Sequence, residues 1–171
     1  MLTAAVDADL PHIVHLANLA YRGGGDAAGW TTEAAYIQGE RLSLAQLQAD
    51  LAAQPDARLM VYRDAPDGPL LGSVWLEPQA DAWYLGLLTV HPQMQNRQLG
   101  RAILSAAEAF AKGHGAGRIR MSVVNVRDTL IAWYERRGYA LTGATAPFPY
   151  DEQFGKPLRD DLCFVTLDKA L

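Results

Sequence analysis

The sequence predicts an α/β (mixed α+β) fold, a sheet with helices packed on its faces, and three observations lead to that prediction. The chain has 171 residues, 50% of them apolar and 20% charged, which suits one globular domain spanning residues 1–171. Residues 58–90 contain three short strand-like runs, as in an antiparallel meander. Residues 98–167 then alternate between helix-like and strand-like periods, an order that places helices against a sheet.

The first third of the chain contains clear helix signals. Asp7 precedes apolar residues at helical spacing and is expected to cap a helix that ends near Tyr21. Ser43 and Gln46 form the capping-box pattern of a second helix. Three consecutive glycines, in a stretch without a clear period, predict a loop between the two helices. The expected order is strand, helix, loop and helix, at residues 2–6, 7–21, 22–33 and 43–54.

The rest of the chain supplies the sheet and two further helices. A turn at residues 65–68 joins the first two strands of the meander. The helix that begins near Gln98 has Leu99, Ile103 and Phe110 on one apolar face. The expected strands are residues 58–63, 70–77, 83–90, 118–124, 139–142 and 162–167, and the expected helices are residues 98–113 and 127–136.

Charge and cysteine content exclude several classes of function. The net charge is −4, so we expect no nucleic acid partner. Cys163 is the only cysteine, which excludes an internal disulfide and a cysteine-rich zinc site, and the four histidines lack metal-ligand spacing, so no metal is expected. The sequence has neither the pattern of a secretory signal nor the roughly 20 apolar residues of a membrane span. We expect a cytoplasmic protein with no membrane partner.

The junction between the strand that ends at Val90 and the helix near Gln98 has the features of a phosphate site. The first turn of a helix presents free backbone N–H groups to an anion. Gly100 removes a side chain where a ligand would approach, and Arg97 and Arg101 supply positive charge. An ordinary helix start with solvated arginines is the alternative interpretation of the same pattern.

Three segments resemble the GNAT superfamily of acetyltransferases. The segment Val90–Leu104 resembles the acetyl-coenzyme A motif Q/R-x-x-G-x-G/A, with Gln95 at its first position and Gly100 at its last, while Gln98 stands where the motif has its first glycine. Residues 130–139 are similar to the L-Y-x-x-x-G-F/Y segment of the family, and residues 5–11 match its opening pattern. The resemblance implies the GNAT fold, a mostly antiparallel sheet of about six to seven strands with helices on both faces, and acetyl-CoA as the co-substrate.

The resemblance also implies which residues bind acetyl-CoA. The family's fourth and fifth strands splay apart, here near Leu88 and Val90, and main-chain N–H groups released there stabilise the oxyanion. Tyr134 matches the tyrosine that protonates the departing thiolate, although an aromatic core residue is the alternative. Arg127 stands where many relatives have an asparagine that contacts the cofactor. The expected set is Leu88, Thr89, Val90, Gln95, Asn96, Arg97, Gln98, Leu99, Gly100, Arg101, Ala102, Asn125, Arg127 and Tyr134.

The residue that accepts a proton from the attacking ammonium is not settled by the sequence. Glu33 and Glu77 are the candidate bases, and Tyr84 or a water held by main chain would serve as well. A small-molecule amine or an exposed amino group of a peptide is the expected acceptor, because aromatic and carboxylate groups suit an amine. The residues expected to bind it are Trp30, Thr31, Thr32, Glu33, Tyr36, Tyr84 and Phe148.

The function that follows is an N-acetyltransferase in which a primary amine attacks acetyl-CoA directly in a ternary complex. A non-catalytic acyl-CoA-binding or regulatory module with the same fold is the alternative, because Gln98 departs from the motif and no base is obvious. An edge strand near the C-terminus could pair with a second chain, which would give a homodimer.

Overall fold

The fold is organised around one sheet of seven strands. The computed structural model describes residues 1–23, 29–95, 97–151 and 154–171. A separate two-stranded sheet pairs β2 (Ile37–Gln38) with β8 (Lys156–Pro157). The strands of the large sheet are, in spatial order, β1 (Leu2–Ala4), β3 (Arg58–Tyr62), β4 (Gly72–Pro78), β5 (Trp83–Val90), β6 (Arg118–Val124), β9 (Cys163–Ala170) and β7 (Ala140–Pro147).

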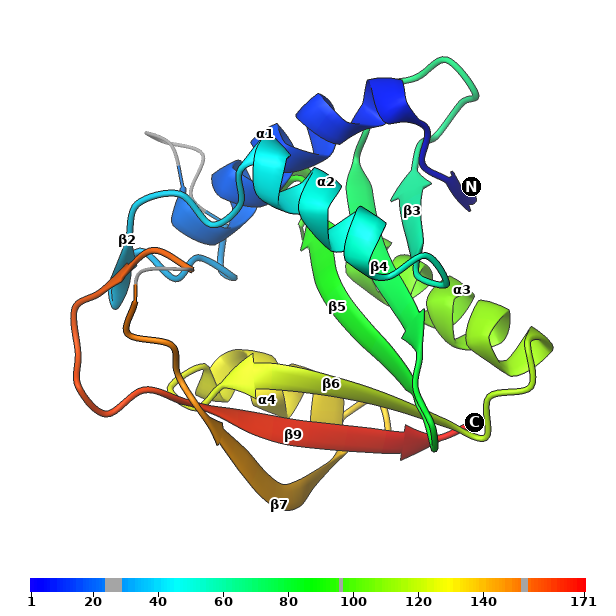
Figure 1. Cartoon of the computed structure of the whole chain (residues 1–171). Coiled ribbons are helices and arrows are strands. Elements are labelled where there is room, and N and C mark those ends of the chain that lie inside the picture. The colour runs from blue at the N-terminus through cyan, green and yellow to red at the C-terminus, as the bar shows by residue number, and fades with distance from the viewer. Residues whose placement is uncertain (24–28, 96, 152–153) are drawn as a thin grey trace.

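Four α-helices cover the two faces of this sheet. A short 3₁₀ turn, Asp7–Asp9, leads into α1, and α2 begins directly after Ser43, whose Oγ accepts a hydrogen bond from the backbone N–H of Gln46 at 3.1 Å. The side chain of Gln46 donates to Asp50 instead of completing the capping box. In Figure 1, α1 and α2 lie on one face and α3 and α4 on the other. The helices are α1 (Leu10–Arg22), α2 (Leu44–Ala53), α3 (Leu99–Gly113) and α4 (Asp128–Glu135).

Alternating side chains on the strands build a separate core on each face. Leu59 and Val61 of β3 pack with α1 and α2, whereas Met60 between them packs with α3. In β4, Trp75 belongs to the α1–α2 side, and its neighbours Val74 and Leu76 belong to the α3–α4 side. The mixed α/β class, the mostly antiparallel sheet and the helices on both faces are therefore confirmed.

The sheet opens between β5 and β6, its one parallel pair among the described strands. These strands are paired at Trp83 with Ile119 and at Tyr84 with Arg120, and Figure 1 shows them diverging beyond those residues. On the other edge of β5, Leu87 and Leu88 lie opposite the single residue Val74 of β4, which is a β-bulge. Leu87 has a φ of 48°. The divergence expected beside Leu88 is thus present, and the bulge lies in the part of β5 that has separated from β6 (Figure 1).

Several element bounds differ from the sequence-based expectation. Residues 83–90 and 118–124 form strands with the expected bounds, but the strand expected at residues 139–142 continues to Pro147. It is an edge strand, exposed along its whole length, and a homodimer formed through it stays a prediction. The pairing of β2 with β8 was not expected, because each strand has two residues and no period. Within the described ranges, no helix has the length and apolarity needed to cross a membrane.

Candidate active site

The opening between β5 and β6 contains two cavities that meet. The first, which we call the α3 cavity, has a volume of about 390 Å³ and lies between the end of β5, the N-terminus of α3 and one side of α4. The second, the aromatic cavity, has a volume of about 310 Å³ and lies between β5, β6 and the segments that contain Phe148, Phe154 and Phe164. Five residues line both cavities and so mark where they meet: Tyr21, Leu88, Arg127, Leu130 and Tyr134.

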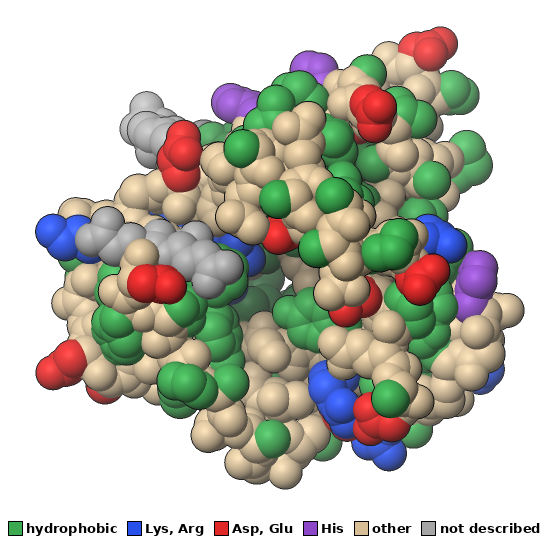
Figure 2. Space-filling model, viewed as in Figure 1, with side chains coloured by type: hydrophobic (Ala, Val, Ile, Leu, Met, Phe, Trp, Pro, Cys, Tyr) green, Lys and Arg blue, Asp and Glu red, His purple; other side chains and the backbone are tan. Residues whose placement is uncertain are grey.

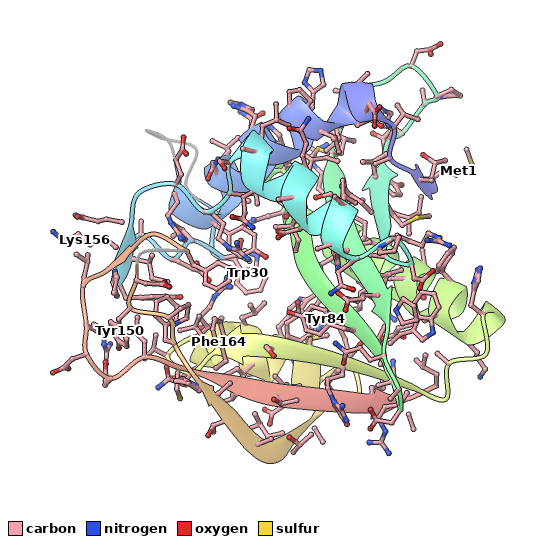
Figure 3. All side chains as sticks on the ribbon, in the orientation of Figure 1. Met1, Trp30, Tyr84, Tyr150, Lys156 and Phe164 are labelled. Atoms are coloured by element: carbon pink, nitrogen blue, oxygen red, sulfur yellow. The ribbon has the colours of Figure 1, made fainter. Side chains whose placement is uncertain are left out.

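The hollow in Figure 2 lies between the part of the molecule formed by α1 and α2 and the part formed by β6, β7 and β9, with hydrophobic side chains around it. In Figure 3, Tyr84 on β5 and Phe164 on β9 lie on opposite sides of this central gap, and Trp30 lies near its upper edge. Tyr84 and Phe164 line the aromatic cavity, and Trp30 lines the α3 cavity. Residues that border this gap (Figure 3) therefore line both cavities.

The start of α3 forms one wall of the α3 cavity. Gln98, the residue before the helix, has φ 60° and ψ 8°, a left-handed conformation that is sparsely populated by residues other than glycine. Gly100 follows in the first turn, and a Cβ added there would lie 3.6 Å from the nearest atoms of Trp133 and Val90. The backbone N–H groups of this turn have no partner within the helix. The turn is thus open toward the cavity and carries the positive end of the helix dipole.

Gln95, at the first position of the motif, connects this turn to the loop before β2. Its Oε1 accepts from the backbone N–H of Trp30 at 3.0 Å, and its Nε2 donates to Oγ1 of Thr31 at 3.0 Å. The ring of Trp30 lies 6.4 Å from that of Trp133 on α4. A residue expected to bind the cofactor and two expected to bind the acceptor are therefore in direct contact.

Tyr134 is buried where the two cavities meet. Its ring packs edge-on against Trp133 and Tyr139, with ring centroids 5.1 and 5.6 Å away. No group in the described part of the chain forms a hydrogen bond with its hydroxyl. Burial raises the pKa of this hydroxyl above its ordinary value, so the hydroxyl stays protonated at neutral pH and can donate.

The bulge of β5 is held by two neighbouring hydroxyl groups. Tyr21 at the end of α1 donates to the carbonyl of Leu88 at 3.3 Å, and Thr89, which is 1% exposed, donates to the carbonyl of Leu87 at 3.0 Å. Burial also raises the pKa of Tyr21. These bonds fix the backbone of the strand at the place where both cavities touch it.

A buried ion-pair network closes one side of the aromatic cavity. Glu33 accepts from Arg22 at 2.6 Å through one carboxylate oxygen and from Arg127 at 3.0 Å through the other. The three side chains are between 5% and 9% exposed. Arg127 also donates to the carbonyl of Thr31 at 2.5 Å, and Arg22 donates to the carbonyls of Gly39 and Phe154. The network joins the end of α1, the loop before β2 and the start of α4.

Glu77 and Tyr84 face each other across β4 and β5. Their Cα atoms are register partners, and Glu77 accepts from the indole N–H of Trp75 at 3.1 Å. The ring of Tyr84 lies over Gly86 of the same strand, where an added Cβ would come within 2.8 Å of the ring. Burial raises the pKa of Tyr84. Tyr36 lies farther out, and burial raises its pKa to about 12.

The two cavities bring together most of the residues expected from the sequence. Six of the described ones line neither cavity, and Asn125 among them instead bonds to the backbone of Asp161 and Cys163. Asn96 lies outside the described residues. The six are Thr32, Tyr36, Glu77, Arg97, Ala102 and Asn125. Those that line a cavity are Trp30, Thr31, Glu33, Tyr84, Leu88, Thr89, Val90, Gln95, Gln98, Leu99, Gly100, Arg101, Arg127, Tyr134 and Phe148.

Other cavity residues were missed by the sequence analysis because no local pattern marks them. They come from helix ends, from α4 and from the segments on either side of β8. The missed residues include Tyr21, Arg41, Trp133, Arg136, Arg137, Phe154 and Phe164.

No three histidine, cysteine, aspartate or glutamate side chains are grouped as a metal site within residues 1–23, 29–95, 97–151 and 154–171.

Fold and site together define an α/β protein in which a strand splay lies beside a helix start that lines a cavity. Residues 19–139 match the family described as the acetyltransferase (GNAT) family, and the chain belongs to that family. The resemblance recognised in the sequence is thereby confirmed.

Similarity to individual proteins is lower than the family match. Over 100 residues the chain is 32% identical to the mycothiol acetyltransferase of Beutenbergia cavernae, a match that covers 58% of this chain and 32% of that protein. The chain thus spans about a third of the length of that relative.

Two solved structures share the fold. The ribosomal-protein-alanine N-acetyltransferase of Brucella melitensis has a TM-score of 0.72 at 17% identity, over 100% of this chain and 99% of that one. A GNAT family acetyltransferase from Elizabethkingia anophelis with acetyl-CoA bound has a TM-score of 0.61 at 15% identity, over 73% and 82% of the two chains.

Proposed function

We propose that this chain is an N-acetyltransferase that moves an acetyl group from acetyl-CoA to a primary amine, by direct attack within a ternary complex. The observation that carries the proposal is the pair of cavities that meet at Leu88 and Tyr134. One cavity would hold the acyl donor and the other the amine, so that the reacting atoms come together beside the bulge of β5. The whole chain, residues 1–171, would then form one acetyltransferase domain.

The α3 cavity fits the phosphate end of the donor. Gly100 and Arg101 line this cavity at the first turn of α3, and Gly100 places no side chain between the backbone and a ligand. Free N–H groups and the helix dipole at this turn favour a pyrophosphate. Gln98 has a left-handed conformation, which glycine adopts more readily, so a glutamine at this position strains the turn. The pantetheine arm would run from this turn along β5, where the strand has separated from β6.

At the meeting point of the cavities, the residues of the chain supply two parts of the chemistry. Once an ammonium proton has left, the nitrogen lone pair bonds to the thioester carbon and the carbonyl electrons move to oxygen. Main-chain N–H groups in the stretch Leu88–Val90 stabilise that oxyanion. When the oxyanion collapses, the C–S bond breaks and Tyr134 gives its proton to the sulfur. The nitrogen loses its second proton to solvent, and Tyr134 regains one.

The proton acceptor is best assigned to the side of the cavity near Tyr84. Both oxygens of Glu33 are engaged by guanidinium groups, so neither is free to accept a proton from an ammonium. Its role as a base stays a prediction, and the ion pairs weigh against it. Glu77 accepts one hydrogen bond, from the indole N–H of Trp75, and lies opposite Tyr84, which lines the aromatic cavity. We therefore assign the proton to Glu77, through a water that Tyr84 positions.

The proposal is tested by following release of the coenzyme A thiol with acetyl-CoA and a panel of amines. Initial rates at varied concentrations of both substrates should give intersecting double-reciprocal lines, and mass spectrometry of the protein with acetyl-CoA alone should show no acetylated chain. Parallel lines with an acetylated chain would replace direct attack by a covalent route. Tight coenzyme A binding without amine-dependent thiol release would identify the chain as a binding module instead.

A further inference from the structure

We propose that the acceptor amine also carries a carboxylate, that Arg41 binds this carboxylate in the aromatic cavity, and that the body of the acceptor is apolar or aromatic. The inference rests on the proposed function and narrows the acceptor from any primary amine to an amino-acid-like one. Its starting point is a cation in the acceptor-side cavity whose charge the described protein does not neutralise.

Arg41 lines the aromatic cavity and has an unusual environment for an arginine. Its guanidinium carbon lies 5.2 Å from the ring centroid of Tyr21 and 4.9 Å from that of Phe154. Across the residues that the structure describes, no carboxylate lies within ion-pair distance of it. Two aromatic faces orient the planar guanidinium and leave its N–H groups available. This arrangement presents a preoriented, bidentate donor to a ligand carboxylate.

The charge balance of the cavity favours the same class of acceptor. Glu33 is the one acidic residue lining it in the described ranges, and its two oxygens are already taken by Arg22 and Arg127. Adding Arg41 leaves an excess of positive charge around the cavity, even when Glu77, which lies opposite Tyr84 outside the cavity lining, is counted. An amine that bears only positive charge would be repelled, whereas a carboxylate on the same molecule would offset the repulsion.

Arg41 is also placed at the correct end of the cavity. Tyr21 lies under its guanidinium, and the hydroxyl of the same tyrosine donates to the carbonyl of Leu88 at 3.3 Å. Leu88 is one of the residues at which the two cavities meet. A carboxylate held by Arg41 over Tyr21 would therefore direct the amino group of a small acceptor toward Leu88 and Tyr134.

The remaining wall of the cavity is apolar. The ring of Phe164 lies 5.4 Å from that of Phe148 and 6.1 Å from that of Phe154, centroid to centroid. Ile37 and Val124 pack in the same cluster. Such a surface gains free energy by covering hydrocarbon or an aromatic ring.

The donor does not need Arg41. The α3 cavity, where acetyl-CoA is proposed to bind, has its own arginines at positions 101, 136 and 137, and Arg41 does not line it. Replacing Arg41 should therefore affect the acceptor and leave the binding of coenzyme A unchanged.

The test compares amino acids with their uncharged carboxamides, using phenylalanine, leucine and alanine and the amide of each. Arg41→Gln removes the charge, and Arg58→Gln is the matched control, since among the described residues the side chain of Arg58 bonds only to nearby backbone carbonyls. For the best acid, kcat/KM should fall about 10- to 100-fold in Arg41→Gln, mainly through KM, as expected when a charged hydrogen bond is lost. For its amide it should change less than about threefold. Each ratio compares one compound on two enzymes, so differences in amine pKa cancel.

A binding measurement separates this inference from the proposed function. Calorimetry with coenzyme A present should show N-acetylphenylalanine binding more tightly than its carboxamide, and only in proteins that keep Arg41. If that binding holds but no amine is acetylated, the proposed function is wrong and the carboxylate site stands. The inference fails if Arg41→Gln weakens acid and amide equally, if it weakens neither, or if it weakens coenzyme A binding.

Discussion

Removal of the Glu33 carboxylate should destabilise the protein far more than removal of a surface carboxylate. In Glu33→Ala, the guanidinium groups of Arg22 and Arg127 would remain buried, at 9% and 8% side-chain exposure, without their shared counter-ion. Breaking a buried ion pair by deleting one partner costs about 3–5 kcal/mol of unfolding free energy. For a chain of this size, that corresponds to a fall in Tm of roughly 6–20 °C. Glu33→Gln keeps an acceptor oxygen and should lose less.

Urea unfolding followed by circular dichroism measures this effect as a shift in midpoint at constant slope. The matched control is Asp161→Asn, which breaks the pair with Arg159, where the two side chains are 47% and 54% exposed. That change should leave the unfolding midpoint almost unchanged, because water screens the pair. The reasoning is refuted if Glu33→Ala unfolds within 1 kcal/mol of the control. A Glu33→Gln protein of normal stability whose kcat falls by about 10²-fold would instead make Glu33 the base.

Three further outcomes are expected. Tyr134→Phe should fold normally, since the hydroxyl of Tyr134 has no bonded partner among the described residues. Its single-turnover rate should fall about 10²-fold while KM for acetyl-CoA stays constant. An unchanged rate would assign Tyr134 to packing. Gly100→Val should weaken coenzyme A binding more than about tenfold in calorimetry. Its Tm should change little, because the nearest atoms to an added Cβ are 3.6 Å away. Unchanged affinity would refute the placement of the pyrophosphate. Hydrogen bonds from Arg120, and to a smaller extent from Arg118, hold the pKa of Asp168 below its ordinary value. The contribution of Asp168 to stability is therefore present above about pH 4 and is lost as the pH falls through the folded-state pKa. In urea unfolding, Asp168→Asn should lose less stability between about pH 5 and pH 2 than the unaltered protein does, and an equal loss of stability would contradict the assignment.

The elements that were predicted most accurately depend on local signals. The strands at residues 83–90 and 118–124 were predicted with their observed bounds, because each has β-forming side chains between clear breaks. Ser43 caps α2 as expected, since capping involves residues three positions apart. The motif around Gln95 and Gly100 likewise identified the helix start that lines the α3 cavity.

The conformation of that helix start was settled only by the structure. The sequence shows a glutamine at position 98 where the motif has glycine, and it left open whether the backbone there needs a positive φ. The structure gives Gln98 a φ of 60°, so surrounding contacts hold the residue in a conformation that its own preference disfavours.

The sequence by itself determined the family, the order of the four helices and of the strands of the large sheet, and the segment proposed to bind the donor, because these depend on periodicity and on residues close together in the chain. Only the tertiary structure decided what surrounds the acceptor. Arg127 lies 94 positions after Glu33, and Arg22 lies 132 positions before Phe154, yet these residues are bonded to one another in the wall of one cavity. A carboxylate or a guanidinium has the same appearance in a sequence whether it is solvated or buried. Its partners, and hence its charge balance and chemistry, are set when the sheet brings distant segments together.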